Sequence, residues 1–169
     1  MEGKCLTREN LMKLLDEMNI ETQTYDHEEA FTVEDMLRFL DGKVGTVAKN
    51  LFINDKKKRN LWLVAAKHDT IINLNSLAKK IKAAGGLRLA SEAILEEKLG
   101  VKQGCVTIFA LLNDTRKEVK VLIDSSLLKE DFVLFHPMTN AASTSVKTSD
   151  VLKFLKEIDR SYELIDFTE

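Results

Sequence analysis

The fold is decided by two apolar runs, Thr46-Val-Ala-Lys-Asn-Leu-Phe-Ile-Asn54 and Asn60-Leu-Trp-Leu-Val-Ala-Ala-Lys67. Their β-branched and aromatic residues are typical of strands. The segment between them, Asp55-Lys-Lys-Lys-Arg59, is polar and charged, as expected for a turn exposed to water. The sequence therefore predicts a β-hairpin with a charged tip.

Helices are predicted wherever a capping residue precedes apolar residues at three- and four-residue spacing. Thr7 can cap a helix that ends near Asn19, and Thr32 opens a capping-box-like start of a helix that stops at Gly42. Farther along the chain, three more helices are expected. One begins at Asn73 or Asn75 and closes at Gly85-Gly86, a second begins at Ser91 and ends at Gly100, and a third begins at Ser149.

Further strands are expected at residues 21–26, 105–112, 119–123, 132–135 and 162–165, whereas residues 87–90 form too short a run to assign. Asn113-Asp-Thr-Arg-Lys117 is the expected polar turn of a second hairpin, and Pro137 should end the strand before it. Hairpins mixed with isolated helices lack the strand-helix-strand alternation of a doubly wound parallel sheet. The pattern predicts an α+β fold with a mixed sheet.

Size and composition favour one compact domain over residues 1–169, since 44% of the 169 residues are hydrophobic. With 25 basic and 27 acidic residues, the chain lacks the global positive field of a protein that holds nucleic acid by charge alone. Cys5 and Cys105 form neither a disulfide framework nor a metal-ligand spacing. No apolar stretch suits a membrane span or a secretory signal, so we expect a cytoplasmic protein without membrane contact.

Lys49 is the clearest candidate for a functional residue, because it shares an alternating row with Val47, Leu51 and Ile53. If this row faces the interior, the ammonium group must lie in a cleft with a partner. Alternatively, the row begins at the edge of the sheet and the lysine side chain extends to water. The pattern alone leaves both interpretations open.

Two loops could present binding groups. His136 follows an apolar strand and opens the polar segment Met138-Thr-Asn-Ala-Ala-Ser143, although an ordinary loop has the same appearance. Gly104 lies in Leu99-Gly-Val-Lys-Gln-Gly104-Cys-Val-Thr-Ile-Phe109, where the missing Cβ would let backbone amides approach a ligand. His27 and His68 are isolated, and the histidine spacing predicts no metal site.

Basic residues gather in two places: the hairpin turn contains Lys56, Lys57, Lys58 and Arg59, and an expected helix contains Lys79, Lys80 and Lys82. Such residues could contact phosphate groups, but a run of basic residues more often forms a turn that is simply exposed to solvent. No Ser-His-Asp order, phosphate-binding fingerprint or dinucleotide fingerprint accompanies them.

Taken together, the segments resemble the YbaK-like editing-domain family, which occurs both inserted in bacterial prolyl-tRNA synthetases and as free-standing proteins. The matching segments are His27-Glu-Glu-Ala-Phe-Thr-Val-Glu-Asp35, Ala48-Lys-Asn-Leu-Phe-Ile53, Asp55-Lys-Lys, Leu61-Trp-Leu-Val64, Gly104-Cys-Val-Thr107 and His136-Pro-Met-Thr-Asn-Ala-Ala-Ser143. The resemblance covers nearly the whole chain. Many relatives have a proline where this sequence has Ile108.

Within this family, the chain looks most like the free-standing alanyl-tRNA(Pro) deacylases. The resemblance implies a mixed, mainly antiparallel curved sheet flanked by helices, and hydrolysis of the ester that joins a wrong amino acid to tRNA, without a metal or other cofactor. It implies that Lys49 is the essential lysine and that the substrate-binding residues are Asn50, Gly104, Val106, Thr107, His136, Thr139 and Asn140. The tRNA-binding residues are expected to be Lys56, Lys57, Lys58, Arg59, Lys79 and Lys80.

The expected partner of this monomer is the acceptor end of mischarged tRNA(Pro), and the resemblance raises prolyl-tRNA synthetase as a second partner. In the mechanism that we expect, Lys49 anchors the terminal nucleotide or polarises the ester, and amides of residues 104–107 stabilise the oxyanion. A ribose hydroxyl helps to activate water. The alternatives are a deacylase for Cys-tRNA(Pro) or Ser-tRNA, and a non-catalytic adaptor that binds tRNA or a synthetase.

Overall fold

An eight-stranded mixed sheet forms the centre of the structure, a computed structural model that describes residues 6–168. The strands are β1 (Gln23–Asp26), β2 (Thr46–Asp55), β3 (Leu61–Lys67), β4 (Leu87–Leu89), β5 (Val119–Asp124), β6 (Phe132–Phe135), β7 (Ala142–Lys147) and β8 (Glu163–Ile165). Their order is β1-β7-β6-β2-β3-β5-β8, and β4 pairs separately with β2. Four pairings are antiparallel and three are parallel, which confirms the predicted mixed, mainly antiparallel sheet.

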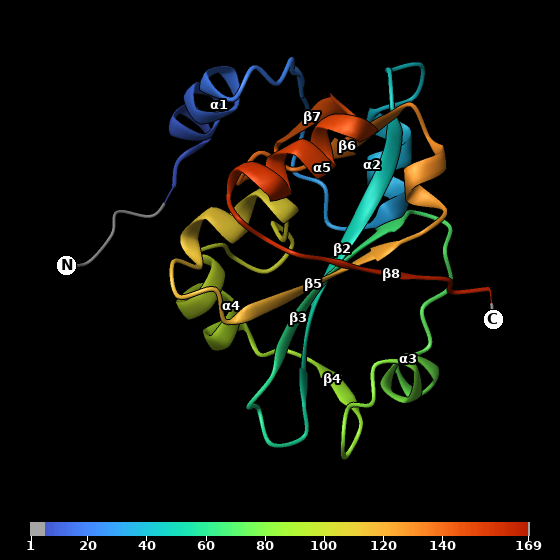
Figure 1. Ribbon diagram of the computed structural model, residues 1–169. Helices are drawn as coiled ribbons and strands as arrows, with labels where there is room; N and C mark the ends of the chain where they lie inside the picture. The colour runs from blue at the N-terminus through green and yellow to red at the C-terminus, as the bar shows by residue number, and fades with distance from the viewer. Residues whose placement is uncertain (1–5, 169) are drawn as a thin grey trace.

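The helices of the described chain cover both faces of this sheet (Figure 1). They are α1 (Arg8–Glu17), α2 (Val33–Phe39), α3 (Leu74–Lys80), α4 (Glu92–Leu99) and α5 (Thr148–Glu157), with the 3-10 helices η1 (Ile108–Asn113) and η2 (Leu127–Lys129). The largest apolar cluster contains residues of α1, α4, α5 and η1. A second cluster packs Leu77 of α3 against β2 and β3, and a third packs Met36 of α2 against β2 and β6.

Four helices begin at the caps that the sequence predicts. The hydroxyl oxygens of Thr7, Thr32 and Ser91 each accept a hydrogen bond from a backbone N–H three residues later. The side-chain oxygen of Asn73, rather than of Asn75, does the same for α3. These bonds satisfy amides that would otherwise lack a partner at the helix start, which fixes where each helix begins.

The predicted cap of the last helix is wrong. Helix α5 begins at Thr148, and the residue in the cap position is Lys147, whose side chain makes no capping bond. Thr148 is held from outside the helix instead: its N–H donates to the carbonyl of Asp131 at 3.0 Å. A neighbouring loop therefore replaces the side-chain cap expected from Ser149.

The second predicted hairpin is also wrong. Residues 108–113 form η1 instead of a strand, and β5 pairs with β3 in parallel. Ile108, Phe109, Ala110 and Leu111 are all buried, so they lack the alternation of a half-exposed strand. A continuous apolar run does not distinguish a strand from a buried helical turn, and here the helical turn is formed.

A buried ion pair joins the end of α5 to the loop before β5. The Arg160 guanidinium donates to the Asp114 carboxylate at 2.9 Å and to the Val119 carbonyl at 2.9 Å. The side chains of Arg160 and Asp114 are only 6% and 3% exposed. Asp114 also accepts hydrogen bonds from the amides of Glu118 and Val119. This carboxylate therefore organises the turn in place of the predicted hairpin.

The substitution Arg160→Met should lower the free energy of unfolding by about 3–5 kcal/mol, because it leaves the Asp114 carboxylate buried without a cation. Urea denaturation measures this difference. The matched control is Arg8→Met, which breaks the exposed Arg8–Asp26 pair and should leave stability nearly unchanged. Equal losses in the two variants would contradict the structural role of the buried pair.

Candidate functional site

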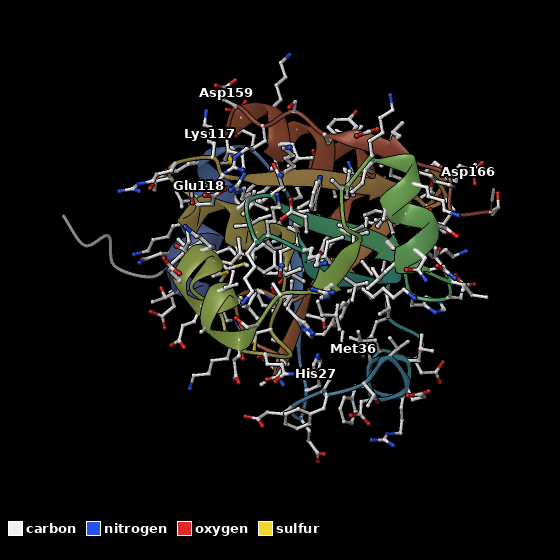
Figure 2. The ribbon with its side chains drawn as sticks, turned by 90° about the horizontal axis from the view of Figure 1, so that it is seen from below. His27, Met36, Lys117, Glu118, Asp159 and Asp166 are labelled. Carbon is white, nitrogen blue, oxygen red and sulfur yellow. The ribbon has the colours of Figure 1, made fainter. Side chains whose placement is uncertain are left out.

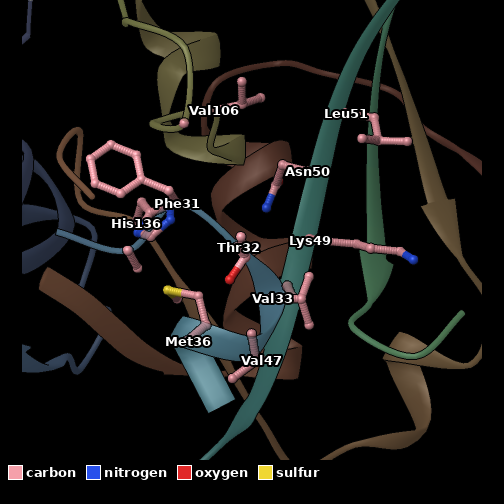
Figure 3. Close-up of a pocket in the computed structure, with 13 residues that line it drawn as sticks. Phe31, Thr32, Val33, Met36, Val47, Lys49, Asn50, Leu51, Val106 and His136 are labelled. Atoms are coloured by element: carbon pink, nitrogen blue, oxygen red, sulfur yellow. The ribbon is translucent and has the colours of Figure 1, made fainter. Parts of the chain in front are cut away.

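A cavity of about 280 Å³ opens where β2, α2 and the loop containing Gly104 meet (Figure 3). Its walls are residues 30–33 and 36 around the start of α2, residues 47–51 of β2, and Gly104, Val106 and His136. None of these residues is an aspartate or glutamate, and apolar side chains form most of the wall. The cavity therefore suits a small ligand with an apolar part.

The cavity occupies a gap in the sheet. On this edge of β2, pairing with β6 ends at Val47 and pairing with β4 begins at Ile53. Strand β6 ends at Phe135, two residues before Pro137, which has no N–H to extend the ladder. Within residues 6–168, no strand pairs with residues 48–52 on this edge. A stretch of open strand edge thus forms one wall.

Asn50 points into this gap from β2, on the same side as Val106 and His136 (Figure 3). Its Oδ1 atom is buried and has no hydrogen-bond partner, alone among the buried side-chain nitrogen and oxygen atoms of the described residues. An unsatisfied buried amide oxygen costs about 1–3 kcal/mol. The nitrogen of the same amide is the atom that points into the gap, so the side chain offers hydrogen-bond donors to a ligand there (Figure 3).

His136 brings a neutral imidazole to the opposite wall. Its Nδ1 lies 3.1 Å from the carbonyl oxygen of Ala142. Because a carbonyl only accepts, Nδ1 carries the proton and Nε2 of the neutral ring is an acceptor. Burial lowers the pKa of His136, a nearby positive charge on His27 lowers it further, and the Ala142 carbonyl partly opposes this shift.

Lys49 lines the cavity, but its side chain extends to the other side of β2, away from Asn50 (Figure 3). The ammonium donates a hydrogen bond to the carbonyl oxygen of Thr70. The hydroxyl of Thr70 in turn donates to the buried Asp124 at 2.5 Å. Lys49 is half-buried, and its ammonium is held by the Thr70 carbonyl. Its side chain therefore neither enters the cavity nor extends freely to water.

The predicted loop residues divide into two groups. Gly104, with a φ of 89°, and Val106 line the cavity, whereas Thr107 is buried and caps η1 through Phe109. Thr139 and Asn140 lie behind the wall. The Asn140 side-chain amide donates to the Ala30 carbonyl at 3.1 Å, and the Thr139 hydroxyl accepts from the backbone of Ala141. Asn140 holds the loop next to the start of α2, whereas the Thr139 bond lies within the loop.

The predicted basic residues lie away from the cavity, at the far end of β2. Lys56, Lys57, Lys58 and Arg59 are exposed around the turn between β2 and β3 (Figure 1). A Cβ added to Gly85 would lie 2.9 Å from the Cβ of Lys56, so this turn touches the loop after α3. Lys80 differs from the others, because its ammonium donates to the Asp166 carbonyl. We call Lys56, Lys57, Lys58, Arg59, Lys79 and Lys82 the basic end.

The start of α2 contributes residues that the sequence analysis did not assign individually. Phe31 lines the cavity and is 70% exposed, and Thr32, Val33 and Met36 form the adjoining wall. Figure 2 shows Met36 and His27 at the same end of the molecule, opposite Lys117 and Asp159. An aromatic residue in a polar segment just before a helix cap is the sequence signal that would have identified Phe31.

Within residues 6–168, the other reactive groups form no second catalytic or metal centre. Burial raises the pKa of the Cys105 thiol, which opposes formation of a nucleophilic thiolate. Among the described residues, no group of three or more histidine, cysteine, aspartate or glutamate side chains could hold a metal ion. Cys5 lies outside the described residues. None of the helices within residues 6–168 has the length and apolarity needed to cross a membrane.

Comparison with known proteins identifies the family. Residues 27–154 match the sequence model of the aminoacyl-tRNA editing domain. The chain is 42% identical over 163 residues to prolyl-tRNA synthetase associated domain-containing protein 1 of Xenopus laevis, covering 95% of this chain and 96% of that protein. It is 34% identical over 152 residues to the prolyl-tRNA editing protein ProX of Acetoanaerobium sticklandii, covering 90% and 92%.

A solved structure has the same fold. A crystal structure described as that of a candidate trans-editing enzyme for prolyl tRNA synthetase superposes with a TM-score of 0.70. It covers 97% of this chain and 98% of its own, at 15% sequence identity. At this identity the likeness concerns the fold alone.

The pKa of His136 should lie below the usual 6.5, because burial favours the neutral ring. NMR titration of the ring protons measures it. The folded state then binds this proton less readily than the unfolded state, so His136 should lower stability as the pH falls below about 6.5. Removing the nearby charge by His27→Gln should raise the pKa of His136, and a value above 6.5 in the unsubstituted protein would contradict this description.

Proposed function

Because the chain belongs to the aminoacyl-tRNA editing domain family, we propose that it is a trans-editing hydrolase that cleaves the ester of mischarged tRNA, with Ala-tRNA(Pro) as its substrate. The observation that carries this proposal is the small cavity into which the side-chain amide of Asn50 points from β2, on the same side as His136 (Figure 3). A cavity of this kind supplies hydrogen bonds to the polar part of an aminoacyl ester and apolar contacts to a methyl side chain. The whole chain acts as one catalytic unit in this proposal.

The reaction needs no nucleophilic side chain. A water oxygen attacks the ester carbonyl carbon, the bond from that carbon to the ribose oxygen breaks, and the ribose oxygen takes up a proton as alanine leaves. Positioning of water and stabilisation of the oxyanion supply the rate enhancement. Backbone amides around Gly104 are the candidate oxyanion donors, and a ribose hydroxyl or Nε2 of His136 can accept the proton of the attacking water. The proposed reaction is independent of metal.

Lys49 acts by anchoring the terminal nucleotide in this proposal. Its ammonium extends away from Asn50 and His136, which favours contact with a phosphate over polarisation of the ester carbonyl. The bond to the Thr70 carbonyl, supported by Asp124, holds the side chain on the side of β2 away from the cavity. A long lysine side chain can exchange this carbonyl for a phosphate oxygen.

Phe31 supplies a surface for the terminal adenine base. Its ring is largely exposed at the mouth of the cavity, and exposure of an apolar side chain to water is unfavourable. Stacking of a base on an aromatic ring contributes about 1–3 kcal/mol. An aminoacyl group in the cavity places the attached adenosine at its mouth, within the region of this ring.

The size of the cavity selects alanine by excluding larger side chains, since a small pocket gains little energy from a single methyl group. Met36 and Val33 form part of the apolar wall, and His136 limits the opposite side. The protein works as a cytoplasmic monomer on the tRNA acceptor end, and prolyl-tRNA synthetase is the candidate partner that produces the mischarged substrate. The basic end contacts phosphate groups farther along the tRNA.

Labelled Ala-tRNA(Pro) should be hydrolysed, whereas Pro-tRNA(Pro) should be spared and Cys-tRNA(Pro) should react more slowly.

In Lys49→Ala the rate on Ala-tRNA(Pro) should fall at least about tenfold while the cavity stays intact, because the terminal nucleotide loses its anchor. Release of the labelled amino acid measures the rates. Full activity of Lys49→Ala would refute the role of the lysine. Tight tRNA binding without hydrolysis of any aminoacyl ester would favour the adaptor.

Neutralising the hairpin turn should weaken tRNA binding without changing the chemistry. Replacing Lys56, Lys57, Lys58 and Arg59 by alanine should raise KM, leave kcat near its original value and flatten the dependence of binding on salt. The control variant replaces Lys13 and Lys153, which lie outside the basic end, and should keep the original salt dependence. An unchanged salt slope in the hairpin variant would exclude this surface.

A further inference from the structure

The carboxylate of Asp124, at the end of β5, is 2% exposed and lies outside the cavity beside β2. Its Oδ1 accepts hydrogen bonds from the Ser126 amide at 3.0 Å and from the Ser126 hydroxyl at 2.8 Å. Its Oδ2 accepts from the Lys67 amide at 3.0 Å and from the Thr70 hydroxyl at 2.5 Å. None of the ion pairs within residues 6–168 includes Asp124, so these hydrogen bonds satisfy the buried group.

Asp124 closes the turn between β3 and α3 at both of its ends. The Thr70 amide donates to the Lys67 carbonyl at 3.0 Å, which makes residues 67–70 a tight turn. Oδ2 of Asp124 bonds the first and the last residue of this turn. Hydrogen bonds to a carboxylate are stronger than those between neutral groups, so this bridge restricts the turn more than its backbone bond alone. The direction of the Thr70 carbonyl is therefore fixed relative to the sheet.

The carbonyl of Thr70 is the group to which the Lys49 ammonium donates. Among the described residues, no carboxylate forms an ion pair with Lys49. A lysine side chain loses rotamer freedom when it is held in one place, and a bond already present in the free protein reduces what is lost when a ligand binds. An ammonium group has three N–H donors, so two remain for a phosphate group while the carbonyl stays bound.

We infer that Asp124 and Thr70 are positioning residues for Lys49: the Asp124 carboxylate orients Thr70 through its hydroxyl, and the Thr70 carbonyl holds the ammonium where it meets the terminal nucleotide. This inference rests on the proposed deacylase function and on the anchoring role of Lys49 within it. Neither positioning residue touches the substrate. Both act through the lysine, so their contribution to the rate should vanish when the ammonium is removed.

The experiment replaces Thr70 by valine, which has the same shape without the hydroxyl, and by serine, which keeps the hydroxyl. For the alanyl ester of tRNA(Pro), kcat/KM should fall about 3- to 10-fold in Thr70→Val, because the turn loses a bond to the carboxylate. Thr70→Ser should restore most of the rate, and Asp124→Asn should resemble Thr70→Val. The matched control is Thr24→Val, which removes a hydroxyl bonded to Thr144 at 2.8 Å in the edge strand β1 and should keep its rate.

The same substitution in a Lys49→Met background separates positioning from a merely structural role. Methionine keeps an apolar chain without the ammonium, so Thr70→Val should lower the rate by no further factor in this background. An equal fold loss in both backgrounds would overturn the inference and leave the deacylase function in place. A Thr70→Ser variant as slow as Thr70→Val would overturn it as well. Thermal unfolding verifies that the variants fold.

NMR of the Lys49 side chain tests the inference without turnover. The signals of its Cε protons are assigned by their loss in Lys49→Met. A held side chain gives the two protons distinct shifts, whereas free rotation averages them. The unsubstituted protein should show two shifts and Thr70→Val a single one, and two shifts in Thr70→Val would overturn the inference. If the protein hydrolyses no ester at all, the deacylase function falls, and these spectra still decide whether Thr70 positions Lys49.

Discussion

The cavity in this structure depends on one interrupted strand edge. Strand β2 is central in the sheet, yet its partners β6 and β4 leave residues 48–51 without a strand partner on one side. Backbone N–H and C=O groups withdrawn from water must be satisfied, so an opening in the middle of a sheet is costly unless a ligand or water completes it. Helix α2 and the Gly104 loop cover the opening without filling it, and the cavity results.

The sequence predicted most elements close to this site, because their signals are local. Thr32 caps α2 as expected, and the alternation of β2 and β3 with the charged turn between them gives the observed hairpin. The parallel pairing of β3 with β5 and the placement of β4 beside β2 could not be predicted in the same way. These pairings join segments distant in the chain, and no local pattern specifies such a neighbour.

The candidate site shows the same limit. The alternating row and the resemblance both directed attention to Lys49, and the resemblance also implied Asn50. The cavity receives the side chain of Asn50, because successive side chains in a strand point to opposite faces. The sequence could not reveal which face would be lined by His136 and Val106. Ile108 is easier to explain: it is the first residue of η1, a position whose N–H has no intrahelical partner, so isoleucine and proline both fit there.

The central claim is that the gap beside Asn50 holds the aminoacyl group. A crystal structure with the non-hydrolysable alanyl-adenosine amide would test it most directly. The account predicts the alanyl group between Asn50 and the ring of His136, with the adenine against Phe31. An alanyl group bound elsewhere, with the gap beside Asn50 filled only by water, would contradict it.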